Sequence, residues 1–156
     1  MSAKFGTVTQ VIGPVIDVSF EGGKDAIPPI YSALKVERDN GETLILEVEQ
    51  HIGESTVRCV AMESTDGICR GVKVENLGHP IAVPTGAQVK GRLLNVIGEP
   101  IDHLKEMDEG SARRSIHQPA PAFADLSISS EILFTGIKVI DLLEPYAKGG
   151  KIGLFG

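Results

Sequence analysis

The first half of the chain is dominated by short runs in which apolar and polar residues alternate. A clear run spans residues 43–49, where Leu44, Leu46 and Val48 alternate with a mostly polar set, Thr43, Ile45, Glu47 and Glu49. A period of two places the apolar side chains on one face of a strand and the polar ones on the other. We therefore predict a half-solvated strand, with the two glutamates on its solvated face and not acting as a catalytic carboxylate pair.

Similar runs at residues 33–36, 55–62 and 69–74 predict further strands. The pair Asn40–Gly41 favours a hairpin turn, because both residues tolerate a positive φ. Gly13–Pro14 interrupts the apolar run of residues 4–20, and we expect two strand arms joined there at a kink. Six or so short strands at this spacing are typical of a small closed barrel or sandwich.

The pattern changes near residue 80, where prolines flank a short apolar run. We place a domain boundary here, which gives domains of residues 1–80 and 81–156. Residues 91–102 predict a buried strand with a Gly-Glu-Pro turn. The charged stretch 105–114 predicts a solvated loop or a poorly formed short helix.

The last part of the chain has a different periodicity. Apolar residues three and four apart predict a helix from about Ile137 to Leu143, which Pro145 ends. The apolar run Lys151–Phe155 has the length of a central strand in a parallel sheet. Gly156 then stands where the first glycine of a phosphate-binding loop, Gly-x-x-x-x-Gly-Lys-Ser/Thr, would lie.

Composition narrows the function classes. The net charge of −6 and the low aromatic content of 4% disfavour a nucleic-acid partner, including an independent single-strand-binding barrel. Cys59 and Cys69 are interpreted as reduced thiols and small apolar residues, since no secretory signal is present. No apolar run reaches the ~20 residues of a membrane span, so we expect membrane association only through partners. The absence of an Arg-rich transit segment fits a bacterial origin.

Several residues could carry chemistry, and for each a structural role is the favoured interpretation. Gly149 and Gly150 could form an anion-binding nest, but turn glycines are expected. Asp141 could ligate Mg²⁺, but a solvated or helix-capping role is favoured. Arg113 and Arg114 could contact acidic partners, but a solvated loop is expected.

The histidines lack metal-ligand spacing and are assigned surface or packing roles. They are His51, His79, His103 and His117. We therefore expect no metal site and no catalytic residue within this chain.

Three segments together carry a family resemblance. They read Val-Ile-Gly-Pro-Val-Ile-Asp-Val at residues 11–18, Gly-Arg-Leu-Leu-Asn-Val-Ile-Gly-Glu-Pro-Ile-Asp at 91–102, and Thr-Gly-Ile-Lys-Val-Ile-Asp through Phe-Gly at 135–156. The chain resembles the catalytic beta subunits of rotary ATP synthases over its whole length. The stretch 145–156 resembles the beta pattern more than that of the alpha subunits or of the vacuolar-type and flagellar-export ATPases.

The resemblance implies a fold and an assembly. Residues 1–80 would be a six-stranded β-barrel within a ring of alternating alpha and beta subunits, and residues from 81 would begin a RecA-like P-loop α/β domain. It implies ATP synthesis from ADP and phosphate with Mg²⁺ at beta/alpha interfaces, driven by a transmembrane proton or sodium gradient. The implied partners are alpha subunits, the central stalk subunit gamma and the peripheral stalk. The implied location is the cytoplasmic face of the bacterial inner membrane.

The same resemblance limits what this chain can do by itself. Of the family's phosphate loop only Gly156 is present, at the edge of the nucleotide site. The loop Lys, the Thr that ligates Mg²⁺, the water-orienting carboxylate and the transition-state arginine are not among these residues. We expect the chain alone to be inactive and to bind no cofactor, and a truncated, non-catalytic assembly module is the alternative function.

Overall fold

A computed structural model describes residues 4–38, 40–105, 107, 110, 112–126 and 131–156. The chain divides into two compact units, Met1–Gln118 and Pro119–Gly156. The predicted boundary near residue 80 stays a prediction, and we describe each unit by itself.

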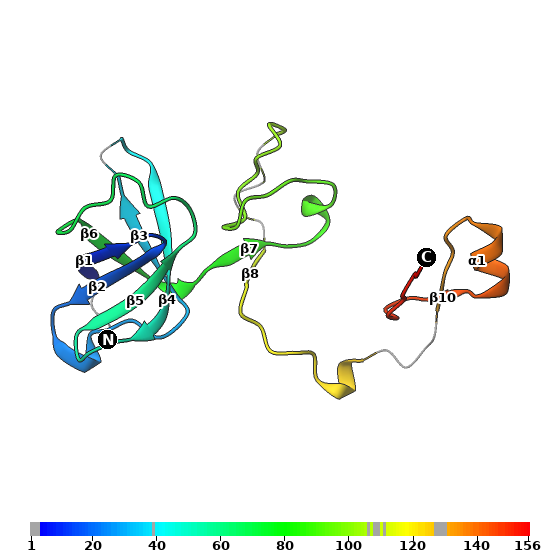
Figure 1. The fold of residues 1–156 in the computed structure, drawn as a ribbon, viewed down its shortest axis with the longest axis horizontal. Helices are drawn as coiled ribbons and strands as arrows, with labels where there is room; N and C mark the ends of the chain where they lie inside the picture. Colours follow the sequence, from blue (N-terminus) through cyan, green and yellow to red (C-terminus); the bar gives the residue numbers. More distant parts are fainter. Residues whose placement is uncertain (1–3, 39, 106, 108–109, 111, 127–130) are drawn as a thin grey trace. The chain divides into compact units, whose positions relative to one another are not determined.

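The first unit contains a closed barrel of six antiparallel strands (Figure 1). Around the barrel the strands follow the order β1-β2-β5-β4-β3-β6. Their bounds are Phe5–Ile12 (β1), Val15–Phe20 (β2), Ser32–Glu37 (β3), Thr43–His51 (β4), Thr56–Ala61 (β5) and Lys73–Pro80 (β6). A short 3-10 turn, Gly23–Asp25, follows β2. The predicted six-stranded barrel is therefore confirmed.

The two arms expected around Gly13–Pro14 are present, but they are not joined by a kink. Ile12 pairs with Val15, so β1 and β2 form an antiparallel hairpin with Gly13–Pro14 as its two-residue turn. Gly13 has a φ of 54°, a conformation that reverses the chain tightly and that glycine adopts at little cost. The expected kink is therefore a complete reversal of the chain.

The barrel closes where its first and last strands meet. Three residue pairs join β1 to β6, from Phe5 opposite Glu75 to Thr7 opposite Lys73. On its other side β6 pairs with β3. Closure leaves no strand of the barrel with an unpaired edge.

The alternating pattern fills the inside of the barrel. Along β5 the side chains at 57, 59 and 61 are buried and those at 58 and 60 are partly exposed, as predicted. The buried apolar cluster comprises Val8, Ile16, Val18, Phe20, Leu34, Val36, Leu44, Leu46, Val48, Val57, Cys59, Ala61, Ile68 and Val74. Removing this apolar surface from water is the main stabilising term, at roughly 25 cal/mol per Å².

The rest of the first unit is built around a short ladder of β7 (Ala82–Pro84) and β8 (Arg113–Ser115), with a 3-10 turn at Ala87–Val89. The buried strand predicted for residues 91–102 is not formed. An isolated bridge joins Leu94 to Pro100, and Leu93 remains 59% exposed. The segment folds back on itself at Gly98, whose φ is 80°, so it makes a narrow loop with no sheet to join.

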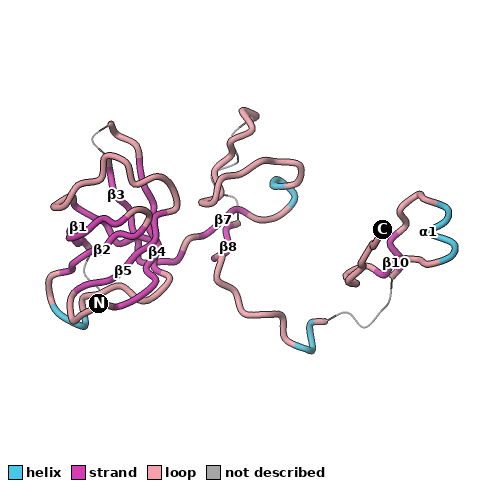
Figure 2. Tube along the Cα trace, in the orientation of Figure 1, coloured by secondary structure: helices cyan, strands magenta, loops and turns pink. Residues whose placement is uncertain are grey.

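In the second unit the regular elements of the described residues are a 3-10 turn, a two-stranded antiparallel ladder and one short α-helix between its strands (Figure 2). They are a 3-10 turn at Phe123–Asp125, β9 (Ile132–Leu133), helix α1 (Lys138–Leu143) and β10 (Tyr146–Ala147), which pairs with β9. The predicted helix is thus confirmed within one residue at its start. The predicted strand Lys151–Phe155 is not formed, and Phe155 is 98% exposed. A strand requires a neighbouring ladder, and β10 already pairs with β9.

Candidate functional site

The stretch 135–156, which leads to the predicted phosphate-loop residue Gly156, begins at the turn before α1. The Asp141 carboxylate accepts hydrogen bonds from the Thr135 amide (2.9 Å), the Thr135 hydroxyl (2.7 Å) and the Gly136 amide (2.9 Å). These bonds to Thr135, opposed by partial desolvation, lower the pKa of Asp141 below its usual value. The carboxylate is occupied in holding the turn before α1, a structural role, whereas the N-cap residue Ile137 carries no side-chain cap hydrogen bond.

Gly149 and Gly150 lie in a tight turn after β10. Gly149 has a φ of 77°, and the Gly150 amide donates to the Ala147 carbonyl at 3.0 Å. The Lys148 amide and ammonium group both contact Glu131, each at 2.8 Å. The geometry therefore supports the expected turn glycines, because one of the amides that a nest would offer is already bonded within the turn.

The same unit holds an apolar cavity of about 510 Å³. It is lined by residues 139, 140 and 143 of α1 and by residues 144–147 and 150–154. Gly156 follows with no regular structure and is exposed. Gly156 stays a predicted edge of a phosphate site.

Glu47 was predicted to lie on a solvated face, but the structure buries it. Its side chain is only 6% exposed, and its Oε2 atom lies 2.8 Å from Nε2 of His117. The His117 ring also stacks on Tyr31, with ring centroids 3.9 Å apart. The polar position faces outward from the barrel, but a segment 70 residues later in the chain covers it.

The sequence had indicated a solvated loop at Arg113. The structure instead places this residue in strand β8. Its guanidinium donates hydrogen bonds to the carbonyls of Ala82 (2.8 Å) and Ile97 (3.1 Å). Arg114 pairs with Val83 in the same ladder and is exposed. Positions 106, 108, 109 and 111 of the predicted loop lie outside the described residues.

The histidines are dispersed, as predicted. His51 bonds the Pro28 carbonyl through Nε2, and His79 contacts the Pro80 carbonyl through Nδ1. His103 is exposed with a φ of 56°. No group of three potential metal ligands occurs in the part of the chain that the structure describes.

The structure contains two arginine–aspartate ion pairs that the sequence analysis did not predict. Arg58 holds buried Asp17 with two hydrogen bonds of 2.8 and 2.9 Å. Arg92 holds Asp102 in the same two-bond manner, and Asp102 also accepts from the Leu104 amide. The hydrogen bond from Arg92, opposed by desolvation, lowers the pKa of Asp102 far below its usual value. Recognising the first pair required the β2–β5 register, in which Asp17 lies opposite Arg58.

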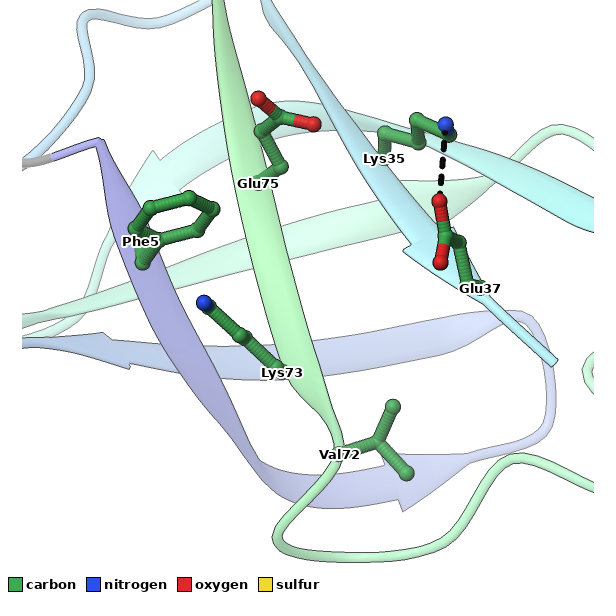
Figure 3. A pocket seen from close by; sticks show the side chains of 6 residues that line it. All are labelled: Phe5, Lys35, Glu37, Val72, Lys73 and Glu75. Atoms are coloured by element: carbon green, nitrogen blue, oxygen red, sulfur yellow. Dashed lines mark hydrogen bonds and ion pairs between the residues drawn. The ribbon is translucent and has the colours of Figure 1, made fainter. Parts of the chain in front are cut away.

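A shallow cavity of about 250 Å³ lies on the barrel wall beside β1, β6 and β3 (Figure 3). The Lys73 ammonium group lies 3.6 Å from the centroid of the Phe5 ring, a cation–π contact. Lys35 pairs with Glu37 at 3.0 Å, and Glu75 also lines the cavity. The charges are largely satisfied locally, so the cavity has the character of a mixed protein surface more than of a catalytic site.

The described helices include none that is long and apolar enough to cross a membrane. In the first unit, the ion pairs described above have structural roles in and around a complete barrel. In the second unit, the polar groups described above hold its turns.

The barrel also matches a known family. Residues 8–78 match the family model described as ATP synthase alpha/beta family, beta-barrel domain. The matched residues run from within β1 to within β6 and so include most of the closed barrel. Residues 8–78 are therefore similar to the beta-barrel domain of the ATP synthase alpha/beta family.

Proposed function

We propose that this chain is the N-terminal part of a catalytic beta subunit of a bacterial-type rotary ATP synthase. Its barrel docks in a ring of alternating alpha and beta subunits, around the central stalk subunit gamma and held by the peripheral stalk. The observation that carries the proposal is the agreement between the closed six-stranded barrel and the matched family domain.

In this proposal residues 81–156 begin a RecA-like P-loop domain. The exposed apolar residues of the second unit support it, because they are suited to be covered by further strands and helices. They include Val139, Leu142, Leu143, Leu154 and Phe155. The whole subunit would use Mg²⁺ and ATP or ADP, with Gly156 as the first glycine of its phosphate loop, and would lie at the cytoplasmic face of the inner membrane through its partners.

Docking is tested with the chain and an alpha subunit of a bacterial ATP synthase. We expect native mass spectrometry to detect a complex of the two, because the barrel carries the proposed ring contacts. The variant Leu46→Asp places a carboxylate in the barrel interior and should abolish the complex together with the fold. A folded wild-type chain that never associates with alpha would contradict the proposal.

A second candidate is a non-catalytic assembly module that docks in the ring without nucleotide. It is favoured by one observation, that the barrel closes and fills its own core within residues 5–80. Reading the gene beyond codon 156 separates the two functions. Continuation as Gly-Ala-Gly-Val-Gly-Lys-Thr supports the catalytic subunit, and a stop codon there contradicts it.

A further inference from the structure

Residues 113–117, which we term the strap, run along the outside of the first unit just before its end at Gln118. The strap begins as β8, paired with β7. The Ile116 amide then donates to the Ile81 carbonyl at 3.0 Å. His117, the last strap residue, reaches the wall of the barrel itself through Tyr31 and Glu47.

The contact made by His117 combines two interactions. The imidazole lies nearly parallel to the Tyr31 ring, with an interplanar angle of 20°. Its Nε2 atom lies 2.8 Å from the Glu47 carboxylate, which is almost fully buried in β4. The stacking fixes the plane of the imidazole, and the hydrogen bond fixes its direction.

Glu47 depends on this contact. A buried carboxylate without a partner is strongly destabilising. Across the adjacent strands Glu47 lies opposite Ala33 and Val60, which are both apolar. Among the residues that the structure describes, His117 is the hydrogen-bond partner of the Glu47 side chain.

Other charged groups on this face of β3 and β5 are already engaged. Lys35 pairs with Glu37 at 3.0 Å, and Arg58 pairs with Asp17 at 2.8 Å. Neither cation can replace His117 without giving up its own partner.

We propose that His117 is a clasp, which holds the strap closed against the barrel by seating on Tyr31 and Glu47. When the clasp is lost, the strap opens while the barrel stays folded. This inference does not depend on the proposed function, because it uses only contacts within the first unit.

The strap can open independently because it contributes little to the barrel core. The buried apolar cluster contains no strap residue. Apart from the clasp, the strap is held by the short β7–β8 ladder, by the Ile116 amide bond to the Ile81 carbonyl and by hydrogen bonds of the exposed Arg113 side chain. Segments with few buried contacts open at lower free energy than a packed core.

Limited trypsin digestion of the full 156-residue chain tests the clasp, because trypsin cleaves after Arg113 and Arg114 only when the strap leaves its ladder. We expect His117→Asn to accelerate this cleavage about tenfold, the factor expected when a hydrogen bond to a charged group is lost. Cleavage after Arg58, inside β5, reports unfolding of the barrel and should remain slow.

Matched variants separate the clasp from general effects. His103→Asn makes the same change at an exposed histidine, and Asn tolerates its positive φ, so cleavage should be unchanged. Tyr31→Phe keeps the stacked ring and should behave as wild type, whereas Tyr31→Leu should open the strap. Equal cleavage rates in His117→Asn and His103→Asn would overturn the proposal.

Hydrogen exchange gives a second readout. In His117→Asn the Ile116 amide should exchange faster, while the Ala61 amide, bonded to the Pro14 carbonyl at 2.8 Å, should keep its protection. If both amides lose protection together, the strap and the barrel are one cooperative unit and the clasp proposal is wrong.

Discussion

At the scale of single residues, the buried polar groups of the barrel are defined by partners far away in the sequence. Asp17 is held by Arg58, 41 positions later, and Glu47 by His117, 70 positions later. Each carboxylate sits at an outward-facing strand position, which in the sequence is typical of a solvated face. The sequence indicates that these side chains point outward from the barrel, but not which segment covers them. The prediction that Glu47 lies on a solvated face was therefore wrong.

Cys59 is the residue with the most consequential titration. Burial first, and then the negative charges of Asp17 and Glu49, raise the pKa of its thiol from 9.0 to about 12. Below pH 9.0 the thiol is protonated in both the folded and the unfolded chain. From pH 9.0 to about 12 the unfolded chain releases this proton and the folded chain retains it, so stability falls over that window.

We therefore expect the wild-type chain to lose stability between about pH 8 and about pH 10.5 more steeply than Cys59→Ala, which has no thiol at this position. Urea denaturation at the two pH values measures the difference. Cys69→Ala removes the exposed thiol and should retain the wild-type slope. Equal slopes in wild type and Cys59→Ala would show that the Cys59 thiolate is tolerated inside the barrel.

At the scale of elements, the sequence predicted strands where one face is buried and the other is not. Strands β3, β4 and β5 lie within about two residues of their predicted positions, because alternation and the Asn40–Gly41 turn are local signals. The prediction of a buried strand at residues 91–102 was wrong, because an apolar run indicates burial but does not supply a neighbouring strand to pair with. Gly13–Pro14 was misjudged because a kink and a hairpin turn use the same residues, and only strand pairing distinguishes them.

This contrast predicts different effects for two leucines. Leu46 is fully buried in β4, whereas Leu93 is 59% exposed in the 91–102 loop. Leu46→Ala should lower the free energy of unfolding by about 2–5 kcal/mol, through lost transfer energy and a residual cavity. Leu93→Ala should change it by no more than about 0.5 kcal/mol.

Chemical denaturation of the two variants in parallel measures both effects. A loss in Leu93→Ala comparable with that in Leu46→Ala would mean that Leu93 is covered in solution, as the sequence had indicated for a buried strand.

At the scale of the whole molecule, the two units differ in how completely each pairs its own strands and buries its own apolar side chains. The barrel closes all its ladders and buries its own apolar cluster. The second unit exposes large apolar residues such as Leu142 and Leu154, at 81% and 80%. Whether residues 151–155 form a strand of a parallel sheet cannot be predicted from these residues alone. A central strand forms only when neighbouring strands are present to pair with it.

We predict that the 156-residue chain binds Mg-ATP negligibly, because of the phosphate loop that the resemblance implies it holds one glycine and not the Lys and Thr that meet phosphate and Mg²⁺. Isothermal titration calorimetry should detect no heat of binding. Amides 152–155 should also exchange at nearly unprotected rates, since residues 151–156 form no regular structure. Micromolar binding, or strong protection of these amides, would refute the prediction.

The seam between β1 and β6 also determines the order in which the barrel can be completed. Phe5 leaves the ribosome before its partner Glu75, which lies 70 residues later in the chain. Until β6 emerges, β1 and β3 each present an open edge, and an open edge is a template for pairing with another chain. We therefore expect pairing across the seam, which joins residues far apart in the sequence, to be the late step that ends the exposure of the nascent sheet.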